Sequence, residues 1–314
     1  MPHQKIRTVT VCGPTASGKT RLGVEIALRL GGEVVSADSM QIYRGMDIAN
    51  AVPSESEMKN IPHHLIKFLD TSENYSVARY VEDAKSCIFD ISSRGKLPVI
   101  VGGTGLYIDS LLNNVSFLPD SFNESVRKEL QLRADREGID KLYSELQRLD
   151  KEAAEKIHPN NTVKIIRALE IYYSTGKTLT QQNILSKNDS IFDNITIGLD
   201  AKNRDFLYDR INARADKMIE NGLLDEAKDF YGKASGNTAV QAIGYKELKP
   251  YLDGELPLDV CVENLKLSTR HYAKRQLSWF RRNENINVFY IDGYSDFQEL
   301  SRDVTDLILK GWEK

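Results

Sequence analysis

One octapeptide near the start of the chain constrains its fold more than any other feature. Residues 13–20 read Gly-Pro-Thr-Ala-Ser-Gly-Lys-Thr, which fits the phosphate-binding loop pattern of two glycines followed by Lys and a hydroxyl residue. Residues 8–12 are mostly β-branched and apolar, as in a buried parallel strand, and residues 21–30 place Leu and Ile at helical spacing. This order predicts an α/β fold, a P-loop NTPase-like parallel sheet flanked by helices.

The loop predicts a site for a polyphosphate. Its glycines let backbone N–H groups curl round an anion, and the N-terminus of the following helix adds a positive dipole end. Lys19 would reach the phosphate oxygens, and the Thr20 hydroxyl would hold a Mg²⁺ ion that bridges them. A glycine-rich turn without a ligand is the alternative, which the full match between a strand and a helix disfavours. The expected diphosphate-binding residues are Gly13, Pro14, Thr15, Ala16, Ser17, Gly18, Lys19 and Thr20.

The composition is that of an ordinary globular protein. The chain has 314 residues, 41% hydrophobic and 28% charged, which suggests two domains or one domain with a large insertion. No apolar run approaches the roughly 20 residues needed to span a bilayer, and no secretory segment precedes the first strand. The three cysteines, Cys12, Cys87 and Cys261, are too far apart for a structural zinc or a disulfide framework. We therefore expect a cytoplasmic protein with no membrane association. Because the net charge is −3, a nucleic-acid partner would need a local basic patch.

Two further predicted strands end in residues that could take part in catalysis or ligand binding. Residues 33–38 form a short strand that ends in Asp38, and ligands of open α/β sheets bind beyond the carboxyl ends of the strands. Asp38 should therefore lie beside the phosphate loop, although an Asp in this place could also cap a helix. Residues 97–101 form another strand, followed by Gly-Gly-Thr-Gly, whose glycines would let a ligand approach and whose Thr104 offers a hydroxyl. A typical NTPase would place a metal-binding Asp where Gly102 stands, so an ordinary ATPase is disfavoured.

The middle of the chain changes character. Residues 45–75 are polar and broken by prolines, so we expect loop with a short helix there. From 119 to 189 the pattern is charged and helical in period, with no strand candidate. These patterns predict an all-helical insertion domain at 119–189, within a catalytic core made of 1–118 and 190–314.

Two predicted helices of the C-terminal part carry clustered basic residues. On the helix 204–220, Arg210 and Arg214 share a face, where they could clamp a pyrophosphate or only form solvated ion pairs. The long helix 259–282 has no acidic residue from Lys266 onward and interleaves aromatic residues with lysines and arginines. It is the basic patch that an RNA partner requires; the alternative is a core helix with a basic outer side. Further strands are expected at 192–200 and 287–292, and a closing helix at 297–312.

Together these motifs resemble those of one enzyme family, the bacterial tRNA dimethylallyltransferases, also called isopentenyltransferases. The phosphate loop alone would indicate only a superfamily, whereas the whole set is specific and follows the family's order over nearly the whole chain. The matching segments are 13–20, 38–43, 45–48, 101–107, 167–170, 174–177, 241–246, 272–276 and 279–281. Two places depart from the usual pattern: residues 49–52 read Ala-Asn-Ala-Val where Gly-Thr-Ala-Lys is common, and Lys164 stands where Arg is usual.

The resemblance implies transfer of a dimethylallyl group from dimethylallyl diphosphate to N6 of the adenosine just 3′ of the tRNA anticodon, with release of diphosphate. It implies that Asp38 is the general base. It implies that the leaving diphosphate is stabilised by Lys19, Thr104, Mg²⁺ on Thr20, and Arg210 or Arg214. The target adenine would leave its stack, and the protein would bind the anticodon stem-loop as a monomer. Residues implied to contact the tRNA are Asp38, Ser39, Met40, Gln41, Thr104, Arg127, Val163, Lys164, Ile165, Ile166, Arg167, Gln241, Ala242, Ile243, Gly244, Tyr245, Lys246, Arg270, Lys274, Arg275 and Arg281.

Two other functions stay open from the residues alone. A nucleotide or small-molecule kinase uses the same phosphate loop and also carries inserted lids, but the glycine turn after residues 97–101 and the basic aromatic helix argue against it. A regulatory P-loop switch protein would bind partners in a nucleotide-dependent way, and the sequence has no recognisable base-specificity motif for that role. Phosphoryl transfer from ATP would favour the kinase, and partner binding without chemistry would favour the switch.

Overall fold

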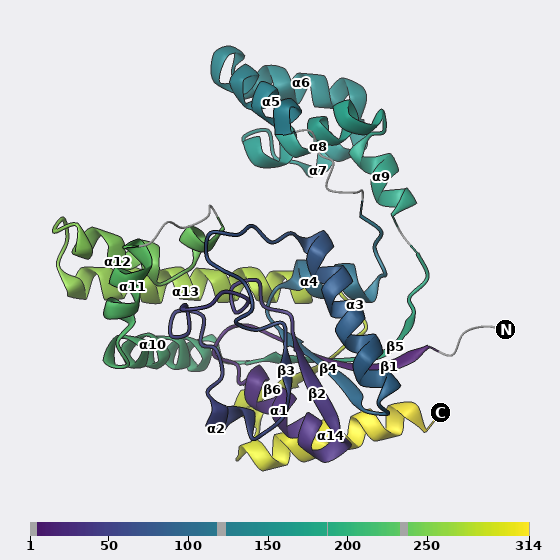
Figure 1. Cartoon of the computed structure of the whole chain (residues 1–314), viewed down its shortest axis with the longest axis vertical. Coiled ribbons are helices and arrows are strands. Elements are labelled where there is room, and N and C mark those ends of the chain that lie inside the picture. Colours follow the sequence, from purple (N-terminus) through teal and green to yellow (C-terminus); the bar gives the residue numbers. More distant parts are fainter. Residues whose placement is uncertain (1–4, 118–123, 187, 233–237, 314) are drawn as a thin grey trace. The chain divides into compact units, whose positions relative to one another are not determined.

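The chain folds into two compact units (Figure 1). The computed structural model describes residues 5–117, 124–186, 188–232 and 238–313. The core unit contains 1–112 and 190–314, and the helical unit contains 113–189. The first boundary therefore follows the end of helix α4 at Leu112, a little before the change in composition at 118/119.

The core unit is built on a six-stranded parallel sheet with the order β3-β2-β4-β1-β5-β6. Its register sets Cys12, the last residue of β1, opposite Gly102 of β4 and Gly198 of β5. The carboxyl ends of these strands thus meet at one edge, where ligands of such sheets bind. The strands are β1 (Ile6–Cys12), β2 (Gly32–Ser36), β3 (His63–His64), β4 (Leu97–Gly102), β5 (Phe192–Asp200) and β6 (Ile286–Tyr290).

Helices cover both faces of the sheet because successive strand residues point to opposite sides. Val34 of β2 belongs to an apolar cluster with α1 (Lys19–Leu30) and α14 (Phe297–Trp312). The next residue, Val35, belongs to a second cluster with α3 (Val77–Ser93) and α4 (Gly105–Leu112). Figure 1 shows α1 beside α14, and α3 beside α4, as two separate groups.

Two long helices, α10 (Arg204–Glu220) and α13 (Leu258–Phe280), pack against each other through an apolar cluster that includes Leu207, Ile211 and Leu277. Both were predicted from the sequence, as were the closing helix α14 and all strands except β3. Helix α11 was not predicted. The remaining elements of the core unit are α2 (Glu55–Met58), α11 (Leu223–Tyr231), α12 (Tyr245–Leu252) and 3₁₀ turns at Ala239–Gln241 and Ile291–Gly293.

The helical unit contains no strand among its described residues, as predicted. Leu142, Leu146 and Leu169 form the centre of its own apolar core. The segments that enter and leave the unit are hydrogen-bonded to each other: the Ser116 N–H donates to the Ser186 carbonyl over 3.0 Å. The helices are α5 (Glu124–Glu137), α6 (Ile139–Leu149), α7 (Lys151–Lys156), α8 (Thr162–Thr175) and α9 (Leu179–Leu185).

Strand β3 is a correction to the loop expected at 45–75. It consists only of His63 and His64, which pair with Val34 and Val35 at the edge of the sheet. So short a strand has no periodicity that a sequence could reveal. The rest of the segment is loop with the short helix α2, as expected.

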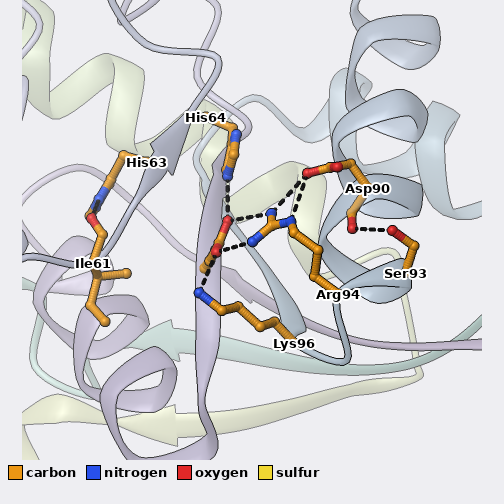
Figure 2. A network of polar contacts seen from close by, with 8 residues as sticks. Ile61, His63, His64, Asp90, Ser93, Arg94 and Lys96 are labelled. Carbon is orange, nitrogen blue, oxygen red and sulfur yellow. Dashed lines mark hydrogen bonds and ion pairs between the residues drawn. The ribbon is translucent and has the colours of Figure 1, made fainter.

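A buried carboxylate fastens β3 and α3 to the amino end of β2 (Figure 2). Glu33 is only 2% exposed and accepts hydrogen bonds from Arg94 at 2.5 and 2.8 Å and from Lys96 at 2.8 Å. The ring Nε2 of His64 lies 2.8 Å from the same carboxylate. The hydrogen bonds from Arg94, followed by those from Lys96 and His64, hold the pKa of Glu33 well below its usual range, against the opposing effect of burial.

Candidate active site

The carboxyl ends of β1 and β2, together with α10 and α13, surround a cavity of about 230 Å³. All of its lining residues belong to the core unit. The cavity combines the phosphate loop with the loop that carries Asp38, two segments that the sequence predicted to be neighbours. The predicted site residues on its wall are Thr15, Lys19, Thr20, Asp38, Ser39, Met40, Gln41, Arg214, Gln241, Ala242, Ile243, Lys246 and Arg275.

The phosphate loop has the backbone that an anion cradle requires. Gly18 precedes α1 with a φ of 90°, and no side chain caps the free N–H groups of the helix. Gly13 has a φ of 151°, and a Cβ there would lie 2.7 Å from the carbonyl oxygen of Leu199. The Ser17 hydroxyl is buried without a hydrogen-bond partner among the described residues. An oxyanion would give these donors a partner, so the loop fits a diphosphate.

Lys19 lies within this loop, and its buried ammonium would be stabilised by a bound anion. Its Nζ donates to the carbonyl oxygen of Pro14 over 3.2 Å. Burial lowers the pKa of Lys19 to about 8, and the charge of Arg214 acts in the same direction, whereas the carboxylate of Asp38 opposes the shift. A diphosphate bound beside Lys19 would favour the charged ammonium in the same way as Asp38 does.

Asp38 follows β2 and lines the cavity. Its Oδ1 accepts the N–H of Met40 over 3.0 Å, which shapes a turn. No helix begins here, so the helix-capping alternative is wrong. Thr104 braces the same loop, because its Oγ1 accepts the Ser39 N–H over 3.0 Å. The Gln41 amide is also bonded to the protein, through Ser36 and the carbonyls of residues 50 and 51.

The glycines at and after the end of β4 make room for other parts of the protein, whereas the close approach of a ligand was expected. A Cβ on Gly102 would lie 2.1 Å from the carbonyl oxygen of Ala37, and one on Gly105 would lie 2.3 Å from the ring of Trp279. Each glycine therefore makes room for another part of the protein. The turn packs against the loop after β2 and against α13.

The two arginines of α10 differ in their positions. Arg210 is exposed, and its Nε donates to the carbonyl oxygen of Ala16 over 2.8 Å. Arg214 is half-buried and lines the cavity. Burial lowers the pKa of the Arg214 guanidinium, whereas the carboxylate of Asp38 favours its charged form. Arg214 therefore faces the cavity, whereas Arg210 supports the phosphate loop.

Helix α13 contributes cavity residues that were not assigned to the site. Thr269, Tyr272 and Gln276 line the cavity from one face of this helix. Gln276 is 5% exposed and contacts the phosphate loop directly, because its Oε1 accepts the Thr15 N–H over 2.8 Å. Burial raises the pKa of Tyr272. The spacing of these polar residues was a usable signal, but the basic residues between them dominated the pattern.

Several basic residues predicted to bind RNA already have protein partners. Arg270 donates to the Asn212 side chain over 2.8 Å, and Arg281 lies 3.1 Å from the Asp200 carboxylate. Helix α13 lacks acids in this stretch, but α10 and β5 supply these partners. Lys274 and Arg275 are exposed, and Arg275 also lines the cavity.

Segment 241–246 is only partly accessible. The side chain of Tyr245 is fully buried, and its hydroxyl donates to Glu226 over 2.9 Å. Ala242 and Gly244 are buried as well, although Ala242 touches the cavity. A contact of the Tyr245 side chain with RNA was therefore a wrong expectation. Gln241 and Lys246 are exposed at the cavity.

The residues predicted in the helical unit also separate by burial. The side chains of Ile165 and Ile166 are 0% and 5% exposed, so they form the core of the unit and cannot contact RNA, which corrects the expectation. Arg127 and Arg167 are both bonded to the buried carboxylate of Glu170, at 2.9 and 3.0 Å. The side chains of Val163 and Lys164 are exposed at the start of α8.

The donors at the cavity fit a magnesium ion that is shared with a phosphate ligand. Thr20 and Asp38 both line it and offer hard oxygen atoms. The described residues contain no group of three or more His, Cys, Asp or Glu that could hold a metal by itself. Mg²⁺ commonly takes only one or two protein ligands and completes its shell with phosphate and water, so this small donor set is sufficient.

Comparisons with known proteins agree on one family. A family model described as IPP transferase matches residues 41–283, and one described as isopentenyl transferase matches residues 6–72. The tRNA dimethylallyltransferase of Bacillus subtilis is 47% identical over 290 residues, which cover 92% of each chain. That of Caldanaerobacter subterraneus is 45% identical and covers 96% of this chain and 98% of its own.

Solved structures give the same result. The crystal structure of a full-length tRNA isopentenylpyrophosphate transferase from Bacillus halodurans is 43% identical, with a TM-score of 0.74 over 98% of this chain and 97% of its own. A eukaryotic dimethylallyltransferase acting on tRNA is 32% identical, with a TM-score of 0.80 over 91% of this chain and 74% of its own.

Proposed function

The chain belongs to the tRNA dimethylallyltransferase family and is a prenyltransferase that modifies tRNA, and we propose that its strand-end cavity is the place of transfer. The donor would be dimethylallyl diphosphate, and the acceptor would be N6 of the adenosine 3′ of the anticodon. The relatives described above carry names of prenyl-group transferases, so the kinase and switch alternatives are not retained. No helix in the described part of the chain is long and apolar enough to cross a membrane.

Asp38 is proposed as the general base. The lone pair of the adenine amine is delocalised into the ring, so its attack is helped by removal of a proton. The Asp38 carboxylate lines the cavity, and its loop is fixed by the hydrogen bonds to Met40 and between Ser39 and Thr104. The N6–C bond forms as the allylic C–O bond breaks, and the N6 proton passes to Asp38.

The phosphate loop is proposed to stabilise the leaving diphosphate. Negative charge grows on the diphosphate as the C–O bond breaks, and donors fixed in advance stabilise it without reorganisation. Lys19 and the free N–H groups at the start of α1 would provide this on one side, and Arg214 on the other. A Mg²⁺ ion held by Thr20, when bound, would add charge neutralisation at the phosphate oxygens.

The target adenine is proposed to enter the cavity flipped from its stack, near residues 38–41. Exposed cations, including Lys164, Lys246, Lys274 and Arg275, would contact RNA phosphates. The anticodon stem-loop as the bound part of tRNA, the monomeric state and the cytoplasmic location stay predictions from the sequence.

One observation carries the proposal: Asp38 and Lys19 lie on the wall of one cavity, so a base and an anion site face the same space. The test is incorporation of labelled dimethylallyl diphosphate, with Mg²⁺, into an unmodified anticodon stem-loop carrying adenosine 3′ of its anticodon. A matched stem-loop with guanosine there lacks the N6 amine. We expect label only in the adenosine RNA, and phosphate transfer from ATP in a parallel reaction would instead contradict the proposal.

The variant Asp38→Ala separates the two halves of the site. We expect its pyrophosphate affinity, measured without Mg²⁺, to stay within about threefold of wild type, because the phosphate loop is intact. Transfer should fall by about 10²- to 10⁴-fold, the usual contribution of a positioned base. Full transfer by Asp38→Ala would contradict its assignment as the base.

A further inference from the structure

One side chain of α13 joins two loops of the active site. The Gln276 Oε1 accepts the Thr15 N–H over 2.8 Å, and its Nε2 donates to the carbonyl oxygen of Gly103 over 3.0 Å. Thr15 belongs to the phosphate loop after β1, and Gly103 belongs to the turn after β4. A carboxamide suits this bridge because it has an acceptor and a donor in one rigid plane.

The surrounding backbone is shaped for this side chain. Gln276 is 5% exposed, and a Cβ on Gly103 would lie 2.1 Å from its Nε2. Any other residue at 103 would displace the amide or the turn, so the glycine and Gln276 form one unit. Buried polar groups of this kind hold their partners in place, because an unpaired group in the interior is costly.

The bridge continues to the loop of the general base. Residue 104 follows Gly103, and the Thr104 hydroxyl accepts the Ser39 N–H over 3.0 Å. Asp38 is the residue before Ser39. The connection therefore runs from the diphosphate loop, through Gln276 and the turn after β4, to the carboxylate that would take the proton. These loops follow three different strands, and Gln276 itself comes from a helix far away in sequence.

We propose that Gln276 is a positioning residue for the transfer reaction, which fixes the separation of the diphosphate loop from the Asp38 loop. This inference rests on the proposed function of the site. Group transfer needs the attacking nitrogen, the allylic carbon and the leaving oxygen in a narrow geometry, and a misplacement of about 1 Å can cost 10²-fold in rate. Gln276 would act on kcat, because it changes alignment and leaves the phosphate-binding donors in place.

The variants Gln276→Met and Gln276→Glu test the two hydrogen bonds. Met has a similar length and makes neither bond, so kcat should fall by about 10- to 100-fold while the pyrophosphate affinity stays within about threefold of wild type. Glu at neutral pH can still accept the Thr15 N–H but cannot donate to Gly103. A protonated Glu carries one donor and one acceptor, as Gln does.

The pH profile of Gln276→Glu gives a readout that general loosening would not produce. The ratio of its kcat to the wild-type kcat should rise as pH falls from 8.5 to 5.5, as the carboxyl becomes protonated and regains the bond to Gly103. Taking the ratio at each pH removes the titration of those groups that behave alike in the two proteins. A ratio that does not change with pH would overturn the proposal, even if Gln276→Met fails to fold.

The control is Thr305→Val on α14. It also removes a buried hydrogen bond, from the Thr305 hydroxyl to the Ser301 carbonyl at 2.7 Å, but it lies outside the cavity wall. We expect near-wild-type kcat from this variant. The proposal is overturned if Gln276→Met keeps kcat within threefold of wild type. It is also overturned if Gln276→Met and Thr305→Val each lose activity in proportion to their loss of thermal stability. Failure of the proposed function would appear differently, as no transfer by the wild-type protein.

Discussion

Arg210 donates from its Nε to the carbonyl oxygen of Ala16 over 2.8 Å, and it thereby supports the phosphate loop. Arg214, one helical turn later, lines the cavity itself. The two side chains share a helix face, but of the two only Arg214 lines the cavity. Their substitutions should therefore have different consequences.

We expect Arg214→Ala to lower kcat/KM for dimethylallyl diphosphate by about 10²-fold, in the range seen when one donor to a developing charge is removed. Arg210→Ala should lower it by about 5- to 10-fold, because it loses one exposed hydrogen bond worth about 1 kcal/mol. Initial rates at saturating stem-loop RNA and varied diphosphate would measure both. Equal losses, or a larger loss for Arg210→Ala, would contradict the separation of roles.

The hydrogen bonds of Glu33 with Arg94, Lys96 and His64 should make the free energy of unfolding depend on pH. The pKa of Glu33 is depressed, mainly by the hydrogen bonds from Arg94, so its contribution is present above the usual carboxyl pKa of 4.5 and is lost as pH falls below that value. Glu33→Gln should lower the free energy of unfolding by about 2 kcal/mol at pH 7. The difference from wild type should shrink below pH 4.5 in urea titrations.

The matched control for this prediction is Asp253→Asn. Asp253 forms an ion pair with Lys249 at 2.6 Å, but both side chains are more than 40% exposed. Exposed pairs of this kind contribute little to stability, because water and salt screen them. A loss at Glu33 no larger than that at Asp253, or a difference that does not change with acid, would show that the buried network adds little.

Removal of magnesium should stop the transfer reaction. We expect EDTA to abolish incorporation of label and added Mg²⁺ to restore it. Thr20→Val keeps the shape of the side chain but loses the hydroxyl, so its activity should fall by about 10²-fold and its dependence on Mg²⁺ concentration should shift upward. Thr20→Ser should stay close to wild type. Unchanged activity in EDTA would remove the metal from the mechanism.

Lys164 should contribute to RNA affinity through a phosphate. Its side chain is exposed at the start of α8, and removing a lysine that pairs with one phosphate lowers the slope of log affinity against log salt by about 1. Lys164→Ala should therefore raise KM for the stem-loop at low salt, with kcat unchanged at saturation. Lys310→Ala, on α14, is the control and should leave the slope unchanged. Identical slopes for all three proteins would place residue 164 outside the RNA interface.

The parts of the fold that sequence could predict are those with local patterns. The helix α10 was predicted with the bounds it has; the structure shows that Asn203 caps its start. Strand β3 could not be predicted, because its two residues are a strand only through pairing with β2. Helix α11 was missed because Gly222 stands before it, so no capping side chain marks its start in the sequence.

The parts of the site that follow directly from strand ends were predictable from the sequence. The parts that depend on how distant elements pack together were not. Asp38 follows β2 and the phosphate loop follows β1, two parallel strands of one sheet with only β4 between them, so their proximity follows from the shared carboxyl edge. Gln276 reaches the same place from α13, and only the packing of this helix against the turn at Gly103 brings it there. The same packing explains why Gly103 and Gly105, expected to face a ligand, face α13.

The hydrogen bond between Ser116 and Ser186 has a consequence for how such a protein can evolve. With the entering and leaving segments fastened to each other, insertions or deletions in the intervening helices need not pull on the strands that hold the catalytic groups. Substitutions in the helical unit can then accumulate separately from those at the carboxyl edge of the sheet.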